Sequence, residues 1–422
     1  MKSFPFLQYF LIGALFAVCL GFLSMQYVFA ETITFSQEGQ SISEEKLIYT
    51  ESELFDLMTP ASVKILQHVE GTVTIPSFVI DPENKTVVVD AVKEPTVLEN
   101  ISEDLLGTGF FVSPDGYIIT SSYAVSLTAS KLVIIDSFIQ RAISEAVDGE
   151  NVEEVIDELF TKEIVDFMLQ EISFDLQMSI IVLGFEEDTE EEDEVFNIYD
   201  LGFVAEVLFV NDNFYKEGQD VALLKITGED HPSASLSERE NIDLGEKVYL
   251  FRSPTTAIIE SVNSLVKEDI YNMSLTSGIV VRENTIASSS IYELDLAVST
   301  DLGGSPVFDA AGDILGIALY DASSGFGDSV SMFILPTNSI NTLLSLTSTT
   351  ASASVFHTRI REGLLFAKEL KCEETYSSFA VAFGSPSVFV DRSVFDKYIE
   401  GCNEMLAIDQ KQNGGFSGIL NT

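Results

Sequence analysis

The stretch GTGFFVSPDGYIIT, residues 107–120, decides the fold of this chain. Two short runs of apolar and β-branched residues flank Ser113-Pro114-Asp115-Gly116. Proline presets one backbone angle of a tight turn and glycine accepts a positive φ at another. The stretch therefore predicts two antiparallel strands joined by a tight turn.

Working outward from this hairpin, residues 51–345 are mainly β in pattern. Short apolar runs such as Ile279-Val280-Val281 and Ile314–Ala318 alternate with turn residues, which is typical of barrels or sandwiches. Residues 137–172 differ, because their apolar residues repeat at helical spacing. We expect them to form a helical hairpin inserted between strands.

Three sequence blocks follow one another in a recognisable order. They are residues 107–120, Asp220–Ile226, and Gly303–Val307 with the strand-like run after it. Together they resemble the blocks that carry the catalytic histidine, aspartate and serine in trypsin-like serine proteases of the HtrA/Deg family. The resemblance covers about residues 55–340. It implies a mainly β, chymotrypsin-like double β-barrel, with a helical insertion, a small C-terminal helical segment, and an active site in the crevice between the barrels.

The chain departs from the family at the residues that do the chemistry. Tyr123 stands at the histidine position, and Gly303 stands at the serine position. Asp301 replaces a glycine whose amide helps to form the oxyanion hole. The aspartate is kept, as Asp220. A phenol with a pKa near 10 is a poor general base, glycine has no nucleophile, and a carboxylate repels a developing oxyanion.

These departures predict a catalytically inactive pseudoprotease. Loss of a triad serine or histidine lowers turnover by on the order of 10⁶. We expect a protein-binding, envelope quality-control or scaffold module, and we hypothesise that the Tyr123 hydroxyl donates to Asp220. A purely structural envelope component is a further alternative.

A divergent active endopeptidase is the competing interpretation, with Ser305 as nucleophile. That role needs the loop to slide by two residues and needs a general base. The three histidines, at 68, 231 and 357, all lie outside the three blocks.

The charge balance is strongly acidic. Asp and Glu number 67 against 22 Lys and Arg, for a formal net charge of −45. Such a surface repels nucleic-acid phosphates and anionic lipids, so we exclude nucleic-acid binding. The family resemblance instead implies a protein or peptide partner. The acidity fits either general solubility, including in salt, or a basic partner. No cofactor or metal site is expected, and the acidic run at residues 186–194 fits a solvated loop.

The two ends of the chain carry separate signals. Residues 1–30 are predicted to be a signal peptide or a membrane anchor, and either would place the rest outside the cytoplasm. Residues 31–50 are predicted to be a linker, 51–345 the double barrel, and 346–422 a connector with a small disulfide-linked segment. Cys372 and Cys402 are expected to form that disulfide, with two free thiols as the alternative. The sequence does not indicate an oligomeric state.

Overall fold

The computed structural model describes residues 48–81, 86–128, 130–132, 134–135, 138, 162–184, 202–212, 220–252, 273–286, 289–297, 302–320, 331–384 and 389–404. The predicted signal or anchor, most of the predicted linker, the acidic run and Asp301 lie outside these residues. Within them, no helix has both the length and the apolarity that crossing a bilayer requires.

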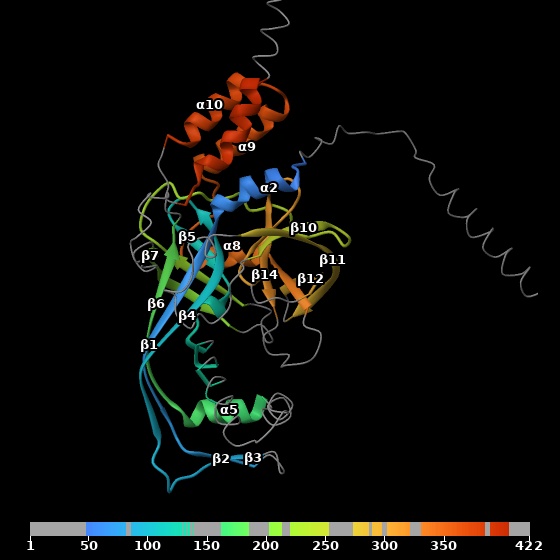
Figure 1. Cartoon of the computed structure of the whole chain (residues 1–422). Helices are drawn as coiled ribbons and strands as arrows, with labels where there is room; N and C mark the ends of the chain where they lie inside the picture. Colours follow the sequence, from blue (N-terminus) through green and yellow to red (C-terminus); the bar gives the residue numbers. More distant parts are fainter. Residues whose placement is uncertain are drawn as a thin grey trace, which may run out of the picture. The chain divides into compact units, whose positions relative to one another are not determined.

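A sheet of seven strands forms the first half of the fold, in the order β7-β6-β1-β4-β5-β9-β8 (Figure 1). Its strands are β1 (Ser62–Ile75), β4 (Thr96–Ser113), β5 (Tyr117–Thr120), β6 (Ser173–Leu183), β7 (Gly202–Val204), β8 (Glu206–Asn211) and β9 (Val221–Lys225). The decisive hairpin is β4 and β5, joined by the predicted turn, in which the Gly116 amide donates to the Ser113 carbonyl at 3.1 Å. This part of the prediction is confirmed.

Ala205 alone separates the two edge strands of this sheet. β7 pairs with β6, whereas β8 pairs with β9, and the Ala205 amide donates to the Ile180 carbonyl of β6 at 2.8 Å. Residues 202–211 therefore act as one bent strand that joins both edges. With that strand counted once, the sheet closes into a six-stranded barrel.

The interior of this first barrel is apolar, as the alternation of its strands requires. Its buried side chains include Val63, Ile65, Phe111, Ile118, Ile180, Val182, Ala222 and Leu224. Phe389, from near the C-terminal end of the chain, is part of the same cluster and is 8% exposed. Its ring lies 5.0 Å from that of Phe111, edge on.

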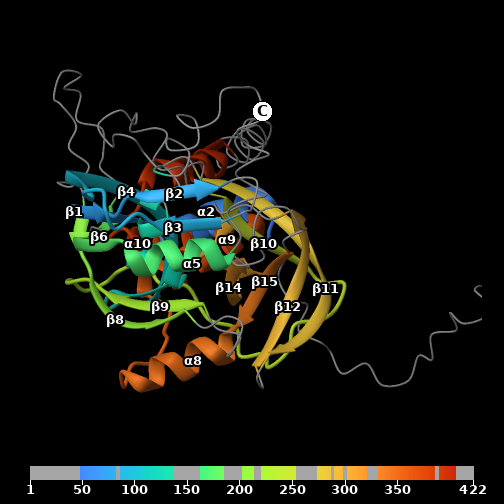
Figure 2. The same cartoon turned by 90° about the horizontal axis from the view of Figure 1, so that it is seen from below.

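The second barrel is closed by hydrogen bonds among six strands, in the order β10-β11-β12-β15-β14-β13 (Figure 2). They are β10 (Lys247–Arg252), β11 (Ser274–Ile286), β12 (Ser289–Ala297), β13 (Pro306–Phe308), β14 (Ile314–Tyr320) and β15 (Ser331–Pro336). Its core contains Val248, Leu250, Leu294, Val307, Leu315 and Ile334. The predicted chymotrypsin-like double barrel is thus confirmed.

Strands β1, β4 and β6 continue beyond the first barrel and carry a second apolar cluster. The helix α5 (Lys162–Glu171) packs there with the hairpin of β2 (Phe78–Asp81) and β3 (Thr86–Val89) (Figures 1 and 2). The Phe78 and Phe167 rings lie 6.4 Å apart. α5 confirms the last part of the predicted helical insertion, and residues 139–161 lie outside the described residues.

The C-terminal helices α8 (Thr337–Leu346), α9 (Val355–Lys368) and α10 (Cys372–Ala382) follow the second barrel. The predicted connector after α8 is held against the first barrel, because the Ser352 amide donates to the Val112 carbonyl at 2.9 Å. α9 packs on both α10 and α2 (Glu51–Met58). Thr50 is the N-cap of α2, and its hydroxyl accepts a hydrogen bond from the Glu53 amide.

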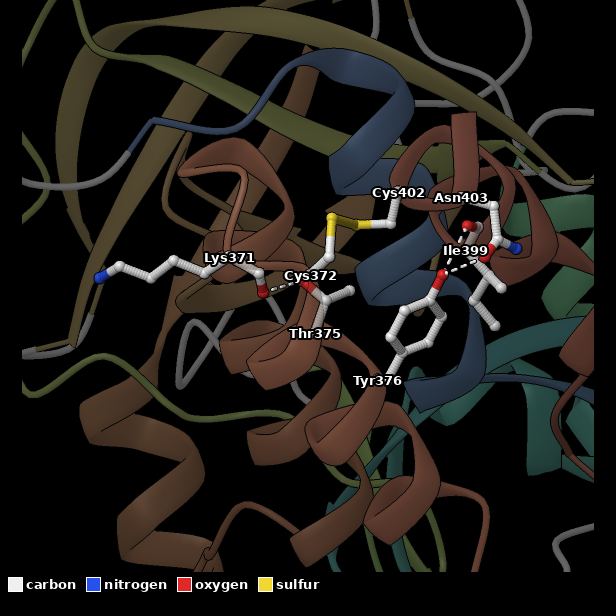
Figure 3. Close-up of a disulfide and its surroundings, with 7 residues drawn as sticks. All are labelled: Lys371, Cys372, Thr375, Tyr376, Ile399, Cys402 and Asn403. Atoms are coloured by element: carbon white, nitrogen blue, oxygen red, sulfur yellow. Dashed lines mark hydrogen bonds between the residues drawn. A yellow bond between two sulfur atoms is a disulfide. The ribbon is translucent and has the colours of Figure 1, made fainter. Parts of the chain in front are cut away.

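The last described segment, residues 389–404, contains η6 (Arg392–Phe395) and a terminal helix. Within it, the Lys397 ammonium and the Tyr398 hydroxyl both lie 2.5 Å from the carboxylate of Asp56 on α2. Cys372 and Cys402 form the predicted disulfide between α10 and this helix (Figure 3). Both cysteines are buried, which favours a structural role for the bond.

Replacing Cys402 by Ser should lower the free energy of unfolding by about 3–4 kcal/mol, because the disulfide restricts the unfolded chain. Urea unfolding, with and without dithiothreitol, measures the effect. The reductant should destabilise the native chain and leave Cys402→Ser unchanged. Equal unfolding midpoints for the two proteins without reductant would contradict the expectation.

Acidic pH should lower the free energy of unfolding through His357 of α9. The side chain is buried, its two ring nitrogens have no hydrogen-bond partner among the described residues, and burial lowers its pKa from 6.5 to about 3. The unfolded chain therefore binds a proton that the folded chain resists, so stability falls as the pH drops from 6.5 toward 3. The free energy of unfolding of His357→Leu should therefore depend less on pH over this range than that of the native chain. An unchanged pH dependence would refute this role.

Candidate functional site

Tyr123, at the expected histidine position, lies in the short helix η2 (Ser122–Val125) that follows β5. Its ring packs against the core of the second barrel and against Leu105 of β4. Burial raises the pKa of the Tyr123 phenol above its usual value of 10.0. A side chain that stays protonated at neutral pH does not accept a proton from a nucleophile.

Asp220, at the expected aspartate position, lies immediately before β9. Its carboxylate accepts hydrogen bonds from the Ser122 amide, at 3.0 Å, and from the Ser122 hydroxyl. Ser122 is thus one donor to this carboxylate, and the hydrogen bond that we hypothesised from the Tyr123 hydroxyl stays a hypothesis. Burial raises the pKa of Asp220, and the hydrogen bonds from Ser122 and from the Tyr123 backbone act in the opposite direction.

Gly303, at the expected nucleophile position, is buried in a turn that runs from Leu302 to Ser305. Leu302 is part of the core of the second barrel. Gly304 has a φ of +84°, and a Cβ atom placed on it would lie 2.2 Å from the Thr108 carbonyl oxygen of β4. The turn is therefore pressed against the backbone of the first barrel, and only glycine fits at its tip.

Ser305, the alternative nucleophile, is fully buried. Its hydroxyl donates to the Phe251 carbonyl of β10 at 2.8 Å, and its amide donates to the Leu302 carbonyl. These contacts fix the serine inside the second barrel. A nucleophile must instead present its oxygen to a substrate carbonyl and to a general base.

The histidines are engaged elsewhere. His231 stacks on Phe111 at 4.9 Å, its Nε2 lies 3.3 Å from the Thr227 carbonyl oxygen, and burial lowers its pKa. His357 is buried in α9. His68 lies on β1 with its Nδ1 2.9 Å from an Asp104 carboxylate oxygen on β4.

The His68 and Asp104 pair deserves comparison with a triad, because strand register places exposed Ser179 of β6 opposite His68. The three residues form a row across β4, β1 and β6, whose backbone groups are paired in the ladder. Amides committed to a ladder are not available to stabilise an oxyanion. We therefore interpret the row as a polar network within the sheet, in which Asp104 is buried and Ser179 is exposed.

The structure shows two contacts around the predicted site residues that sequence reasoning missed, those of Ser122 and of Gly304. Ser122 carries no signal beyond its place beside Tyr123, since its pairing with Asp220 joins residues far apart in the chain. Gly304 could have been noticed, because a second glycine in a turn often marks a positive φ or a close backbone approach.

Comparison with known proteins points to one family. The family model described as "Trypsin-like peptidase domain" matches residues 107–317. Two curated relatives are named "Probable periplasmic serine endoprotease DegP-like", from Pseudomonas savastanoi pv. phaseolicola and Pseudomonas putida. They are 30% and 28% identical over 113 residues. The match covers 25% of this chain and 21% of each relative, so the chain spans about a fifth of their length in this comparison.

Solved structures that match the chain include "HtrA-type protease AlgW with decapeptide", at 14% identity and a TM-score of 0.38, covering 71% of this chain and 68% of that one. The Rv3671c protease from M. tuberculosis in its active form is 15% identical, with a TM-score of 0.36, covering 71% and 86%.

Replacing Asp220 by Asn should raise the free energy of unfolding at pH 7. The folded chain holds the Asp220 proton more tightly than the unfolded chain, so the stability tied to this group falls as the pH rises from the ordinary pKa of 3.8 through the raised value. Urea unfolding from pH 3.5 to 7 measures the gain, which should vanish at the acidic end. The exposed control Glu94→Gln removes the same charge and should show no such pH-dependent gain. A lower free energy of unfolding for Asp220→Asn than for the native chain at pH 7 would contradict this expectation.

Proposed function

The chain belongs to the trypsin-like peptidase family, and we propose that it is a catalytically inactive member that binds a protein or peptide. The family model matches half of the chain, and the DegP-like relatives agree with the HtrA/Deg resemblance of its sequence. What is proposed beyond the family is the loss of peptide-bond cleavage and the binding role that replaces it.

The observation that carries this proposal is the burial of the nucleophile turn. Gly303 has no side chain, and its neighbours Leu302, Gly304 and Ser305 are fixed by packing in the second barrel or against the first. Acyl transfer requires an exposed nucleophile beside oxyanion donors. This turn instead forms a contact between the two barrels.

The general base is the second missing element. The Tyr123 ring packs into the second barrel and keeps its proton, and the Asp220 carboxylate is engaged by Ser122. An aspartate assists catalysis in a triad by orienting a histidine. With Ser122 as its partner, Asp220 instead anchors the start of η2 to the start of β9.

The proposed setting is the cell envelope, outside the cytoplasm. The DegP-like relatives are named as periplasmic, and the N-terminal apolar segment fits either a cleaved signal or a membrane anchor. A binding module there would take part in envelope protein quality control or act as a scaffold. The net charge of −45 favours a partner with basic segments.

The competing function is a divergent endopeptidase that uses Ser305. Its hydroxyl is buried and donates to a backbone carbonyl, so activity would require the turn to leave both barrels. That rearrangement would expose Leu302 from the core, which costs about 1.5–3 kcal/mol for the side chain alone. These contacts favour the inactive interpretation.

An assay with casein and with a fluorophosphonate probe tests the proposal. We expect no cleavage and no labelling by the purified chain, and the same result for Ser305→Ala. A reduced, carboxymethylated protein should bind saturably and be recovered intact. Cleavage that disappears in Asp220→Asn or Ser305→Ala would overturn the proposal. Intact recovery without any binding would overturn the binding role and leave a purely structural one.

A further inference from the structure

A partly enclosed cavity of about 180 Å³ lies between the start of the first barrel and the C-terminal segment. Its apolar walls come from elements distant in sequence. They include Phe55 of α2, Val63 of β1, Leu183 of β6, and Phe389, Val394 and Phe395 of the C-terminal segment. Tyr123, Asp220 and Gly303 are not among the lining residues, so this cavity is distinct from the site described above.

The aromatic walls are held in place by other rings. The Phe55 ring lies edge on to Phe251 at 5.7 Å, and Phe389 is edge on to Phe111 at 5.0 Å. Phe395 lies 5.7 Å from Phe379 of α10. Side chains fixed in this way form a preorganised pocket, which a ligand enters without having to order the walls.

The chemistry of the walls selects the ligand. Asp56, which also lines the cavity, is 3% exposed, and its carboxylate is engaged by Lys397 and Tyr398. Its charge is therefore balanced within the protein. Two further charged residues line the cavity: Lys64 is 3% exposed, and the Asp391 carboxylate accepts hydrogen bonds from the Ser393 amide and hydroxyl. A charged group that entered would lose its hydration among mostly apolar walls, which is costly, whereas an uncharged apolar group would gain from burial.

We propose that this cavity binds an uncharged apolar group about the size of one aromatic ring or one branched aliphatic side chain. An apolar protein cavity of about 150 Å³ accommodates benzene, so the available volume is sufficient for such a group. The group can belong to a small molecule or to a side chain of a peptide. The inference stands beside the proposed function and does not depend on it.

Binding here would tie the C-terminal segment to the first barrel. One wall is carried by η6 and the other by α2 and β1, so a bound group contacts both and stabilises their association. β1 also connects the cavity to the contact between the two barrels. Lys64, another lining residue, pairs across the sheet with Thr108, whose carbonyl oxygen faces Gly304.

Toluene is a suitable probe, with benzoate as its charged counterpart. We expect toluene to bind saturably in ligand-observed NMR and to raise the unfolding temperature, and benzoate at the same concentration to do neither. N-acetylphenylalaninamide tests whether the bound group can be a side chain of a peptide. Binding of toluene and this amide indicates a side-chain site, and binding of toluene alone indicates a small-molecule site. Both results support the cavity.

Val394→Phe should fill the cavity and weaken toluene binding at least about tenfold. Val381→Phe makes the same change at a position of α10 that is 49% exposed. This variant should bind toluene like the native chain. Leu183→Phe fills the cavity from the opposite wall and serves as the second test if Val394→Phe does not fold, which circular dichroism reports. Unchanged binding in a folded cavity-filling variant, no binding to the native chain, or equal binding of benzoate would each overturn the proposal. None of these readouts depends on peptide cleavage.

Discussion

The tip of the turn at residues 302–305 approaches the carbonyl oxygen of Thr108 so closely that no side chain can stand between them. A Cβ atom on Gly304 would lie 2.2 Å from that oxygen and 3.1 Å from the Ser121 amide nitrogen. Both the positive φ and the close approach require glycine. Because Leu302 is in the core of the second barrel while Gly304 touches β4 of the first, this short turn determines how the barrels meet.

Tyr123 and Asp220, the other two positions that the sequence aligns with the family's triad, belong to the same contact. Tyr123 of the segment after β5 packs against the core of the second barrel, and Asp220 holds that segment through its bonds to Ser122. Residues that would face a substrate in an active relative contribute here to packing and to local hydrogen bonding. Burial raises the pKa of the Asp220 carboxyl and so disfavours its charged form, and the hydrogen bonds from Ser122 offset part of that cost.

Local patterns in the sequence were sufficient for much of the fold. The turn residues Ser113–Gly116 define the β4–β5 hairpin, and Asp220 precedes a strand as its block predicts. The disulfide also followed from cysteine count. The pairing of Ser122 with Asp220, the closure of the first barrel at Ala205 and the cavity were not predictable. Each depends on contacts between residues far apart in the chain, for which one sequence carries no periodic signal. The C-terminal segment looked like a separate appendage by composition, yet Lys397 and Phe389 join it to the barrel domain.

The position of Phe389 in the first barrel has a consequence for how the chain is made. The strands of that barrel end at Lys225, but its interior receives Phe389 only after the whole second barrel and the C-terminal helices have been synthesised. At about 5–20 residues per second, the ribosome needs roughly 10–30 s to cover that distance. During this interval the nascent first barrel lacks a side chain of its apolar interior, so its core reaches its final packing only after the C-terminal segment has been made.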